Sequence, residues 1–509
     1  MPSEKNAIYK DPGGKLNIAL VYPNTYWVGM SNLGLHSVYS HLNAHPGIVC
    51  ERFFLDMQRS IEHSRPLQDF HMIAFTIPYE LDWINAVKIL IENKIPVKRM
   101  DRKSGPIVIA GGPSITLNPE PIADSMDALF LGDGEGFAEK LHESFFDSSN
   151  MNEFLERLSS ARGIYIPSFT YPKVSDDNAI TSFVGPRPII SVTNPLDSPA
   201  HTAIITSETV FGDMFMIETA RGCPWKCKFC SAKAVYSPFR PAPLDVVENL
   251  FDKVLGSGLK LGLVSSALND HPKADDMYSM ITRKGLKIAP PSLRTGRITA
   301  GLIELLRYSK VRGVTLAPET GSQDIRYSVG KHITDDMILG DIERLVSSGI
   351  RDIKLYFLIG LPGEEITHVN GITELVKRIR HVFVKVSRGN KRMGQITVSI
   401  NTMVPKPHTP YEREPMINPR EAKSRIKRIS RGLSGLSNVF ISYEGPKWAY
   451  IQSILARGDR AVLDLLIKLA KTESSDWGEV MKQWPRNPDY YALRKRETDE
   501  ILPWSFYGY

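Results

Sequence analysis

The stretch Arg221-Gly-Cys-Pro-Trp-Lys-Cys-Lys-Phe-Cys230 holds three of the four cysteines found in 509 residues, and an apolar strand-like segment precedes it. Thiolates at this density bind zinc or an iron–sulfur cluster more often than they form disulfides. Zinc normally takes four Cys or His ligands, but this loop has no His and the remaining cysteine, Cys50, lies far upstream. Three thiolates on a four-iron cube leave one iron open to a substrate or cofactor. We therefore favour a 4Fe-4S cluster on Cys223, Cys227 and Cys230, with a zinc site or chance spacing as the alternatives.

Composition and charge place the chain among ordinary globular proteins. Hydrophobic residues make up 42% and charged residues 23% of it, and its length suits two or three domains. The polar start, the scarcity of cysteine and the absence of a long apolar run predict a cytoplasmic protein. The net charge of +7 is spread over helices, so we expect neither a nucleic-acid nor a membrane partner.

Residues 1–150 alternate short apolar strands with amphipathic helices, which predicts a Rossmann-like parallel sheet with helices on both faces. Ligands of such sheets bind at the carboxyl ends of the strands, and the loops there are rich in glycine and aromatic residues. The expected strands are Leu16–Tyr22, Phe53–Leu55, Met72–Ile77, Ile107–Ala110 and Ala128–Leu131. The expected helices are Asn32–Ala44, Asp82–Asn93 and Glu135–Phe146.

The remaining chain divides into three parts. Residues 151–210 are rich in proline and serine and are interpreted as a linker. Residues 211–409 repeat a strand–helix unit six times, which predicts a partial (β/α)6 barrel whose chemistry lies at the carboxyl ends of the strands. Residues 410–509 are expected to form a helical C-terminal domain. The expected barrel strands are Phe215–Ala220, Lys260–Val264, Lys287–Ala289, Gly313–Ala317, Asp352–Leu358 and Ile396–Asn401.

Several motifs together carry a family resemblance. The C-x-x-x-C-x-x-C spacing after a strand resembles the radical S-adenosylmethionine (SAM) superfamily, and Lys354-Leu-Tyr-Phe-Leu-Ile-Gly-Leu-Pro-Gly-Glu-Glu resembles the fifth strand of its barrels. Ala110-Gly-Gly-Pro-Ser and Leu131-Gly-Asp-Gly-Glu resemble the cobalamin-binding domain that precedes some of these barrels. The chain as a whole is similar to cobalamin-dependent radical SAM enzymes, most of which are methyltransferases.

One subgroup of that family resembles the chain more closely. Its members have segments like Tyr22-Pro-Asn-Thr-Tyr, Pro405-Lys-Pro-His-Thr-Pro-Tyr, Arg457-Gly-Asp-Arg and Leu502-Pro-Trp. They include an enzyme that C-methylates a glutamine of methyl-coenzyme M reductase, which makes that protein a candidate substrate.

The resemblance implies a SAM site at successive strand ends of the barrel. Arg294 suits the SAM carboxylate, because a guanidinium fork binds a carboxylate bidentately. Glu319 suits the ribose hydroxyls or the ammonium group, and the backbone after the fifth strand suits the adenine. Tyr356 is the candidate catalytic phenol, although packing is the commoner role for any single tyrosine. The expected SAM-binding residues are Phe229, Ser265, Ser292, Arg294, Glu319, Leu358 and Ile359.

The resemblance also implies a corrinoid site in the first domain. Family members that ligate cobalt with a histidine use D-x-H-x-x-G after the first strand, whereas the loop Pro23–Ser31 has no histidine. We therefore expect the lower face of cobalt to lack a histidine ligand, with Asn24, Tyr26 or Met30 nearby; the alternative for Tyr26 is packing. The expected cobalamin-binding residues are Asn24, Tyr26, Met30, Thr76, Tyr79, Gly111, Gly112, Pro113, Gly132 and Glu135.

The implied activity is C-methylation of an unactivated sp3 carbon, through a 5′-deoxyadenosyl radical and methylcobalamin. The implied substrate is an amino-acid residue in a protein, which would be a post-translational modification, and a low-potential donor such as a ferredoxin would supply electrons. Two alternatives remain: a cobalamin-binding radical SAM enzyme of another reaction type, such as a cyclase, or a non-catalytic iron–sulfur and cobalamin binder. A methylthiotransferase would need three more cysteines than the chain offers.

Overall fold

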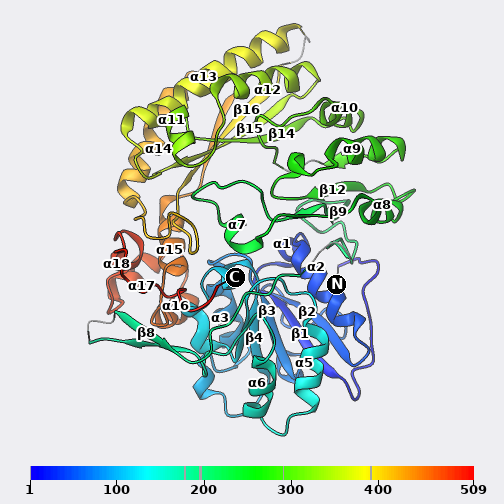
Figure 1. Ribbon diagram of the computed structural model, residues 1–509, viewed down its shortest axis with the longest axis vertical. Helices are drawn as coiled ribbons and strands as arrows, with labels where there is room; N and C mark the ends of the chain where they lie inside the picture. The colour runs from blue at the N-terminus through cyan, green and yellow to red at the C-terminus, as the bar shows by residue number, and fades with distance from the viewer. Residues whose placement is uncertain (1, 177–178, 194–197, 290–291, 390–392, 509) are drawn as a thin grey trace.

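The computed structural model describes residues 2–176, 179–193, 198–289, 292–389 and 393–508. Its N-terminal part is a sheet in the order β2-β1-β3-β4-β5-β6, parallel except for β6 (Figure 1). Strand β1 is buried along its whole length, as expected for a strand covered on both faces. The strands are β1 (Leu16–Tyr22), β2 (Ile48–Phe54), β3 (Met72–Thr76), β4 (Ile107–Gly111), β5 (Ala128–Phe130) and β6 (Ile164–Tyr165).

Helices cover both faces of this sheet, which confirms the predicted Rossmann-like architecture. Helices α2 and α5 pack on one face and α3 on the other. Helix α2 begins after Asn32, whose side chain accepts a hydrogen bond from the Leu35 amide at 3.1 Å, a typical N-cap. The helices are α1 (Tyr26–Gly29), α2 (Leu33–Ala44), α3 (Asp82–Glu92), α4 (Pro113–Leu117), α5 (Phe137–Phe146) and α6 (Met151–Ser159).

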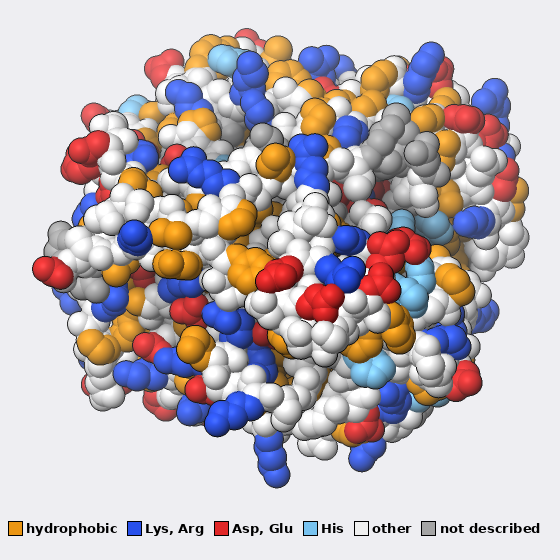
Figure 2. Space-filling view, turned by 60° about the horizontal axis from the view of Figure 1, so that its bottom comes forward, with side chains coloured by type: hydrophobic (Ala, Val, Ile, Leu, Met, Phe, Trp, Pro, Cys, Tyr) orange, Lys and Arg blue, Asp and Glu red, His pale blue; other side chains and the backbone are white. Residues whose placement is uncertain are grey.

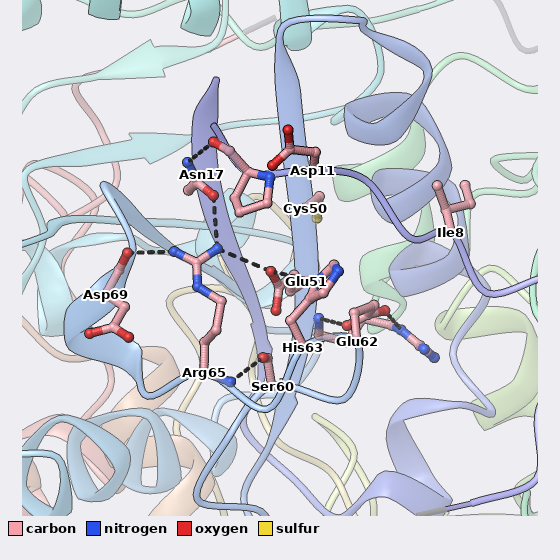
Figure 3. A network of polar contacts seen from close by, with 12 residues as sticks. Ile8, Asp11, Asn17, Cys50, Glu51, Ser60, Glu62, His63, Arg65 and Asp69 are labelled. Carbon is pink, nitrogen blue, oxygen red and sulfur yellow. Dashed lines mark hydrogen bonds and ion pairs between the residues drawn. The ribbon is translucent and has the colours of Figure 1, made fainter. Parts of the chain in front are cut away.

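A buried polar network covers the edge strand β2 of this sheet (Figure 3). Arg65 donates to Asn17 at 2.8 Å and to the fully buried Glu51 at 3.1 Å. His63 also contacts Glu51, at 3.1 Å, and the Arg65 amide donates to Ser60. These contacts hold the loop of residues 60–65 against β2. Because an uncovered edge strand invites pairing with other chains, this loop protects the sheet.

The second body is a curved parallel sheet in two sections (Figure 1). One section has the order β13-β12-β9 and the other β14-β15-β16-β17, and a parallel bridge between Leu293 and Leu316 joins them. The six predicted strands are present, and β17 continues the sheet inside the region expected to be helical. The strands are β9 (Met214–Glu218), β12 (Lys260–Val264), β13 (Ile288–Ala289), β14 (Gly313–Glu319), β15 (Asp352–Ile359), β16 (Gln395–Thr402) and β17 (Val439–Tyr443).

Amphipathic helices cover the outside of this partial barrel and bury its largest hydrophobic cluster. Strand β15 alternates strictly between half-buried and buried residues. Its buried residues Leu355 and Phe357 join the outer core, which leaves Lys354, Tyr356 and Leu358 on the inner face. The helices are α8 (Leu244–Asp252), α9 (Ala274–Arg283), α10 (Ala300–Tyr308), α11 (Gln323–Ser328), α12 (Asp335–Ser347), α13 (Ile366–Gly389) and α14 (Pro419–Leu433).

The segment expected to be a linker contributes structure of its own. Strand β6 lies within it and completes the N-terminal sheet. Beyond it, β7 (Tyr171–Val174) and β8 (Ile180–Val184) form an antiparallel hairpin. Farther along, β10 (Ala220–Arg221) pairs with β11 (Arg240–Pro241), and α7 (Ser231–Tyr236) lies between them in sequence.

The C-terminal helices return to the N-terminal sheet, beside which they lie in Figure 1. They share its hydrophobic core on the α3 face instead of forming a core of their own. Arg460 fixes this contact through Glu120 and Asp124, both at 3.0 Å. The helices are α15 (Pro446–Ala456), α16 (Val462–Ala470), α17 (Trp477–Gln483) and α18 (Pro488–Ala492).

The motifs that distinguish the resembled subgroup meet where the barrel joins the N-terminal domain. Lys406 forms an ion pair with the buried Glu80 of the N-terminal domain. Trp504 donates to Glu412 at 2.7 Å, and Arg460 belongs to the third motif. These residues therefore act structurally, because they fix how the two bodies sit against each other.

Charged and hydrophobic side chains are interspersed on the face seen in Figure 2, in keeping with the modest net charge. Among the described residues, no helix is long and apolar enough to cross a membrane.

Candidate active site

The cysteine loop begins directly after β10 and ends at α7, on the face of the barrel that meets the N-terminal domain (Figure 1). Gly222 opens the loop with a φ of +85°, and a Cβ there would lie 2.5 Å from the Tyr236 carbonyl oxygen. Only glycine tolerates both conditions. The turn after α11 supports the middle of the loop, because the Lys228 amide donates to the Val329 carbonyl at 2.9 Å. The sequence therefore folds into a closed loop that presents the three thiols together.

The three thiols are half-buried and free of disulfides. The pKa of Cys230 is raised to about 11, chiefly by burial and in smaller part by the neighbouring Cys227 and Cys223. In the described part of the chain, no group of three His, Cys, Asp or Glu side chains is arranged around a single metal ion. A cluster needs less convergence than a single ion, because each thiolate binds a different iron atom. The donor set and its closed loop fit a 4Fe-4S cluster.

Arg294 lies beside this loop and is held by stacking. Its guanidinium carbon lies 3.8 Å from the ring centroid of Trp225, which belongs to the cysteine loop. The Trp225 indole in turn donates to Asp270 at 2.8 Å. The guanidinium makes no hydrogen bond or ion pair with the described residues. Arg294 is thus a positioned cation with free donors next to the cysteines, as a carboxylate-binding role requires.

Glu319 ends β14 and lies near enough to Cys230 to act on it electrostatically. It is in the left-handed region, with a φ of +69°, which is uncommon for a residue other than glycine and often marks a functional site. Its carboxylate pairs with Lys331. Its charge also raises the pKa of Cys230, although less than burial does. Sequence analysis found Glu319 but missed its partner Lys331.

The other predicted SAM-binding residues lie around the same face. Phe229 and Leu358 pack together against a small cluster that includes Tyr411. The Ile359 carbonyl accepts from the Met403 amide at 2.9 Å, so that oxygen already has a partner. Ser292 is exposed, and Ser265 lies at the end of β12. Tyr356 is on the inner face, where the Lys354 amine lies 4.8 Å from its ring centroid.

A cavity of about 510 Å³ lies between the two domains. The N-terminal sheet contributes strand ends and the first turns of α2 and α4, and the barrel contributes Arg221, Gly222, Val264 and Ser265. Gly112 and Gly132 have positive φ, and a Cβ on Gly132 would lie 2.1 Å from the Ser191 carbonyl oxygen. Glycine is therefore needed for these turns to form. Six of the predicted cobalamin-binding residues line this cavity: Thr76, Gly111, Gly112, Pro113, Gly132 and Glu135.

The other predicted cobalamin-binding residues, Asn24, Tyr26, Met30 and Tyr79, are not among the lining residues. Tyr26 is buried and donates its hydroxyl to Glu4 at 2.6 Å. Met30 is buried, and its sulfur lies 3.3 Å from an Arg52 donor. Both side chains are therefore packed in the core of the N-terminal domain, as the packing alternative for Tyr26 expects.

An ion-pair network that sequence analysis missed forms one wall of the cavity. Arg221 makes two hydrogen bonds each to Glu218, at 2.8 Å, and to Glu135, at 2.7 and 3.0 Å. It also contacts Asp133 at 3.0 Å, and Asp133 binds Arg240 at 2.6 Å. Burial alone would raise the pKa of Glu135, but Arg221 lowers it to about 2. The spacing of these residues in sequence gives no local signal, because the network joins the loop after β5 with strands β9, β10 and β11.

Two family profiles match the chain. The profile described as Radical SAM superfamily matches residues 217–376, which include the three cysteines, Arg294 and Glu319. The profile described as Radical SAM proteins, N-terminal, matches residues 34–167.

Curated relatives match the chain in sequence, and solved structures match it in fold. An uncharacterized protein of Methanocaldococcus jannaschii is 28% identical over 447 residues, which is 87% of this chain and 89% of the relative. An uncharacterized methyltransferase of Pyrococcus horikoshii is 23% identical over 286 residues, 53% of this chain and 58% of that protein. The structure is similar to the radical SAM methyltransferase TsrM of Kitasatospora setae with cobalamin and a 4Fe-4S cluster bound. The TM-score is 0.54 at 13% identity, covering 78% of this chain and 77% of that one. The chain thus carries a radical SAM domain, on a fold shared with a cobalamin-binding radical SAM methyltransferase.

Proposed function

We propose that this protein is a cobalamin-dependent radical SAM methyltransferase that C-methylates an unactivated sp3 carbon. The main support is the position of the interdomain cavity. Its glycine-rich strand ends lie on one side, and Arg221, Gly222 and Ser265, beside the cysteine loop, lie on the other. Two cofactors bound at these places would share one reaction space. The sequence similarity to an uncharacterized methyltransferase points in the same direction.

When bound, a 4Fe-4S cluster with SAM supplies a 5′-deoxyadenosyl radical and methylcobalamin supplies the methyl group. Cys223, Cys227 and Cys230 hold the cluster in this proposal. Arg294 binds the SAM carboxylate, and Glu319 accepts from the ribose or the ammonium group. Phe229, Ser265, Ser292, Leu358 and Ile359 complete the pocket. Tyr356 is proposed as the phenol that faces the substrate from the inner wall.

In this proposal the N-terminal loops that line the cavity would hold the corrinoid. Gly111, Gly112 and Gly132 would leave room for it, Thr76 and Pro113 would line its site, and Glu135 orients its loop through Arg221. The loop Pro23–Ser31 offers no histidine, so we propose that the protein supplies no histidine to cobalt. Asn24 and Tyr79 follow the neighbouring strands β1 and β3 but are not among the residues that line the cavity.

The proposed substrate is an amino-acid residue in a protein, and a glutamine of methyl-coenzyme M reductase is the first to test. A low-potential one-electron donor such as a ferredoxin is the proposed reductant. No observation at the site favours a second function. The cyclase-type and non-catalytic alternatives are distinguished from methylation by the products of SAM.

The decisive experiment is anaerobic purification with hydroxocobalamin supplied, followed by product analysis after reduction in the presence of SAM. We expect bound iron and sulfide, one corrinoid per chain, and both 5′-deoxyadenosine and S-adenosylhomocysteine. The cyclase-type alternative predicts 5′-deoxyadenosine without S-adenosylhomocysteine. A non-catalytic binder would give neither product, and a chain without corrinoid would contradict the assignment of the cavity.

Replacing Arg294 by Ala is expected to weaken SAM binding roughly 10- to 100-fold, because a charge-assisted bidentate contact contributes about 1.5–3 kcal/mol. The SAM affinity of Arg294→Lys should lie between those of the wild type and Arg294→Ala, because an ammonium group keeps the charge but lacks the guanidinium fork. Iron content should not change in either variant. Equilibrium binding of SAM to the cluster-loaded protein measures the effect.

Arg297→Ala is the matched control. Arg297 is exposed and lies farther from the same ring, 5.2 Å from the Trp225 centroid. Its removal should leave SAM affinity within about twofold of the wild type. Equal losses in Arg294→Ala and Arg297→Ala would contradict the assigned role of Arg294.

A further inference from the structure

The segment that carries the three cysteines is attached to the N-terminal domain at both of its ends. At the first end, Arg221 binds Glu135 and Asp133 of the loop after β5. At the second end, α7 packs against α4, where Ala234 and Val235 bury the side chain of Leu117. The first attachment point belongs to the loop of residues 132–135, which lines the interdomain cavity, and the second belongs to α4, whose first residue Pro113 lines the same cavity.

The base of this segment is also closed on itself. Gly222 lies against the carbonyl oxygens of Tyr236 and Pro238, because a Cβ at Gly222 would be 2.5 and 2.8 Å from them. The two ends of the segment are therefore held together at its base. A displacement of either attachment point would be transmitted to all three thiols.

Arg221 is the stronger of the two attachments. Its side chain is only 10% exposed and contacts three carboxylates, those of Glu218, Glu135 and Asp133. Glu218 comes from the barrel, whereas Asp133 and Glu135 come from the N-terminal domain. Bidentate contacts of this kind fix orientation as well as distance. The Arg221 guanidinium therefore fixes the position of the N-terminal domain relative to the barrel where the cysteine loop begins.

We infer that Arg221, acting through Glu135, is a positioning residue that couples corrinoid binding in the cavity to assembly of the cluster on the cysteine loop. A ligand that fills the cavity immobilises residues 132–135, and the Arg221–Glu135 contact then immobilises the start of the cysteine loop. The first cofactor to bind loses the conformational entropy of ordering these segments. The second cofactor then binds to segments that are already ordered, so binding is cooperative. Because linkage is reciprocal, the cluster must tighten corrinoid binding by the same factor. This inference rests on the proposed function.

The test compares hydroxocobalamin affinity with and without a reconstituted cluster. For the wild type we expect cluster loading to lower the dissociation constant about tenfold or more, which is within the range of typical coupling between sites. Absorbance titration of hydroxocobalamin measures both constants. The electron paramagnetic resonance spectrum of the reduced cluster, recorded before and after hydroxocobalamin is added, gives a second readout that general destabilisation would not change.

Glu135→Gln is the main variant, because it removes one carboxylate from a network of three carboxylates and two guanidiniums and leaves the remaining charges balanced. We expect the affinity ratio to fall below about threefold while each cofactor still binds alone. Arg221→Lys, which keeps the charge and loses the fork, should give an intermediate ratio. Asp127→Asn is the control, because it perturbs a buried pair with Arg102 in the same domain, outside the cavity lining.

A ratio in Glu135→Gln equal to that of the wild type would overturn the inference, as would a wild-type ratio near one. Neither result would affect the proposed function, since both cofactors would still bind. Failure of the wild type to bind hydroxocobalamin at all would instead refute the proposed function and the inference together.

Discussion

Cys227→Ala is expected to lose the cluster and with it all reductive cleavage of SAM, while hydroxocobalamin still binds to the apoprotein. Cys227 is the middle thiolate of the closed loop, and its carbonyl accepts from the Cys230 amide at 3.2 Å. With two protein thiolates left, the cube loses a ligand on a second iron, and cluster binding is coupled directly to the ligand set. Iron and sulfide analysis and the yield of 5′-deoxyadenosine measure the result.

Cys50→Ala provides the matched control. Cys50 is buried in the N-terminal sheet at 1% exposure, and burial raises the pKa of its thiol well above the ordinary value. A small buried group of this kind should cost about 1 kcal/mol of stability when shortened and leave cluster content intact. SAM cleavage that survives in Cys227→Ala would refute the assignment of the cysteine loop.

Much of the fold could be predicted because its elements are strongly periodic. Strands β1 and β12 begin and end at the predicted residues, and β1 is buried along its whole length. Strand β17 was missed. It is a short strand of five residues with three of them exposed and none fully buried, so it lacks the buried apolar residues that each of the other barrel strands contains. Its identity as a strand comes from pairing with β16.

The packing of the C-terminal region also could not be predicted from local sequence patterns. Its helices were predicted, but their packing on the N-terminal sheet depends on contacts such as Arg460 with Glu120, which are separated by 340 residues. The same limit applies to the site. Residues that follow one another at strand ends, such as Gly111 and Gly112, were found from sequence. Arg221 and Asp133 were missed because the charged network exists only when the two domains meet.

This difference between local and long-range signals also explains three of the four predicted cobalamin contacts that are not among the cavity-lining residues, namely Asn24, Tyr26 and Met30. The loop after β1 was selected because it ends a central strand, which is a sound general rule. In this chain the cavity opens toward α2 and α5 instead, as its lining by Val38 and Leu141 indicates. Tyr26 and Met30 consequently pack inward beside Arg52.

Gly134→Leu is expected to weaken hydroxocobalamin binding by at least about 100-fold, which corresponds to about 2.7 kcal/mol. Gly134 lines the cavity, and its φ is not in the left-handed region, so a side chain is sterically allowed by the backbone. A Cβ there would lie 3.5 Å from the Val38 side chain, an ordinary contact. The leucine therefore occupies ligand space without straining the fold. Absorbance titration measures the loss.

Two controls separate blocked space from a damaged fold. Gly134→Ala adds only a Cβ in ordinary contact and should retain binding to within about tenfold. Gly478→Leu places the same side chain in α17 where no atom lies within 4 Å of the new Cβ, and it should leave both cofactors bound. Cluster content and 5′-deoxyadenosine formation should persist in Gly134→Leu, because the cysteine loop keeps its own attachments. Unchanged hydroxocobalamin affinity in that variant would place the corrinoid elsewhere. A simultaneous loss of the cluster would instead mean that the corrinoid site and the cluster site depend on each other, although they lie on separate loops.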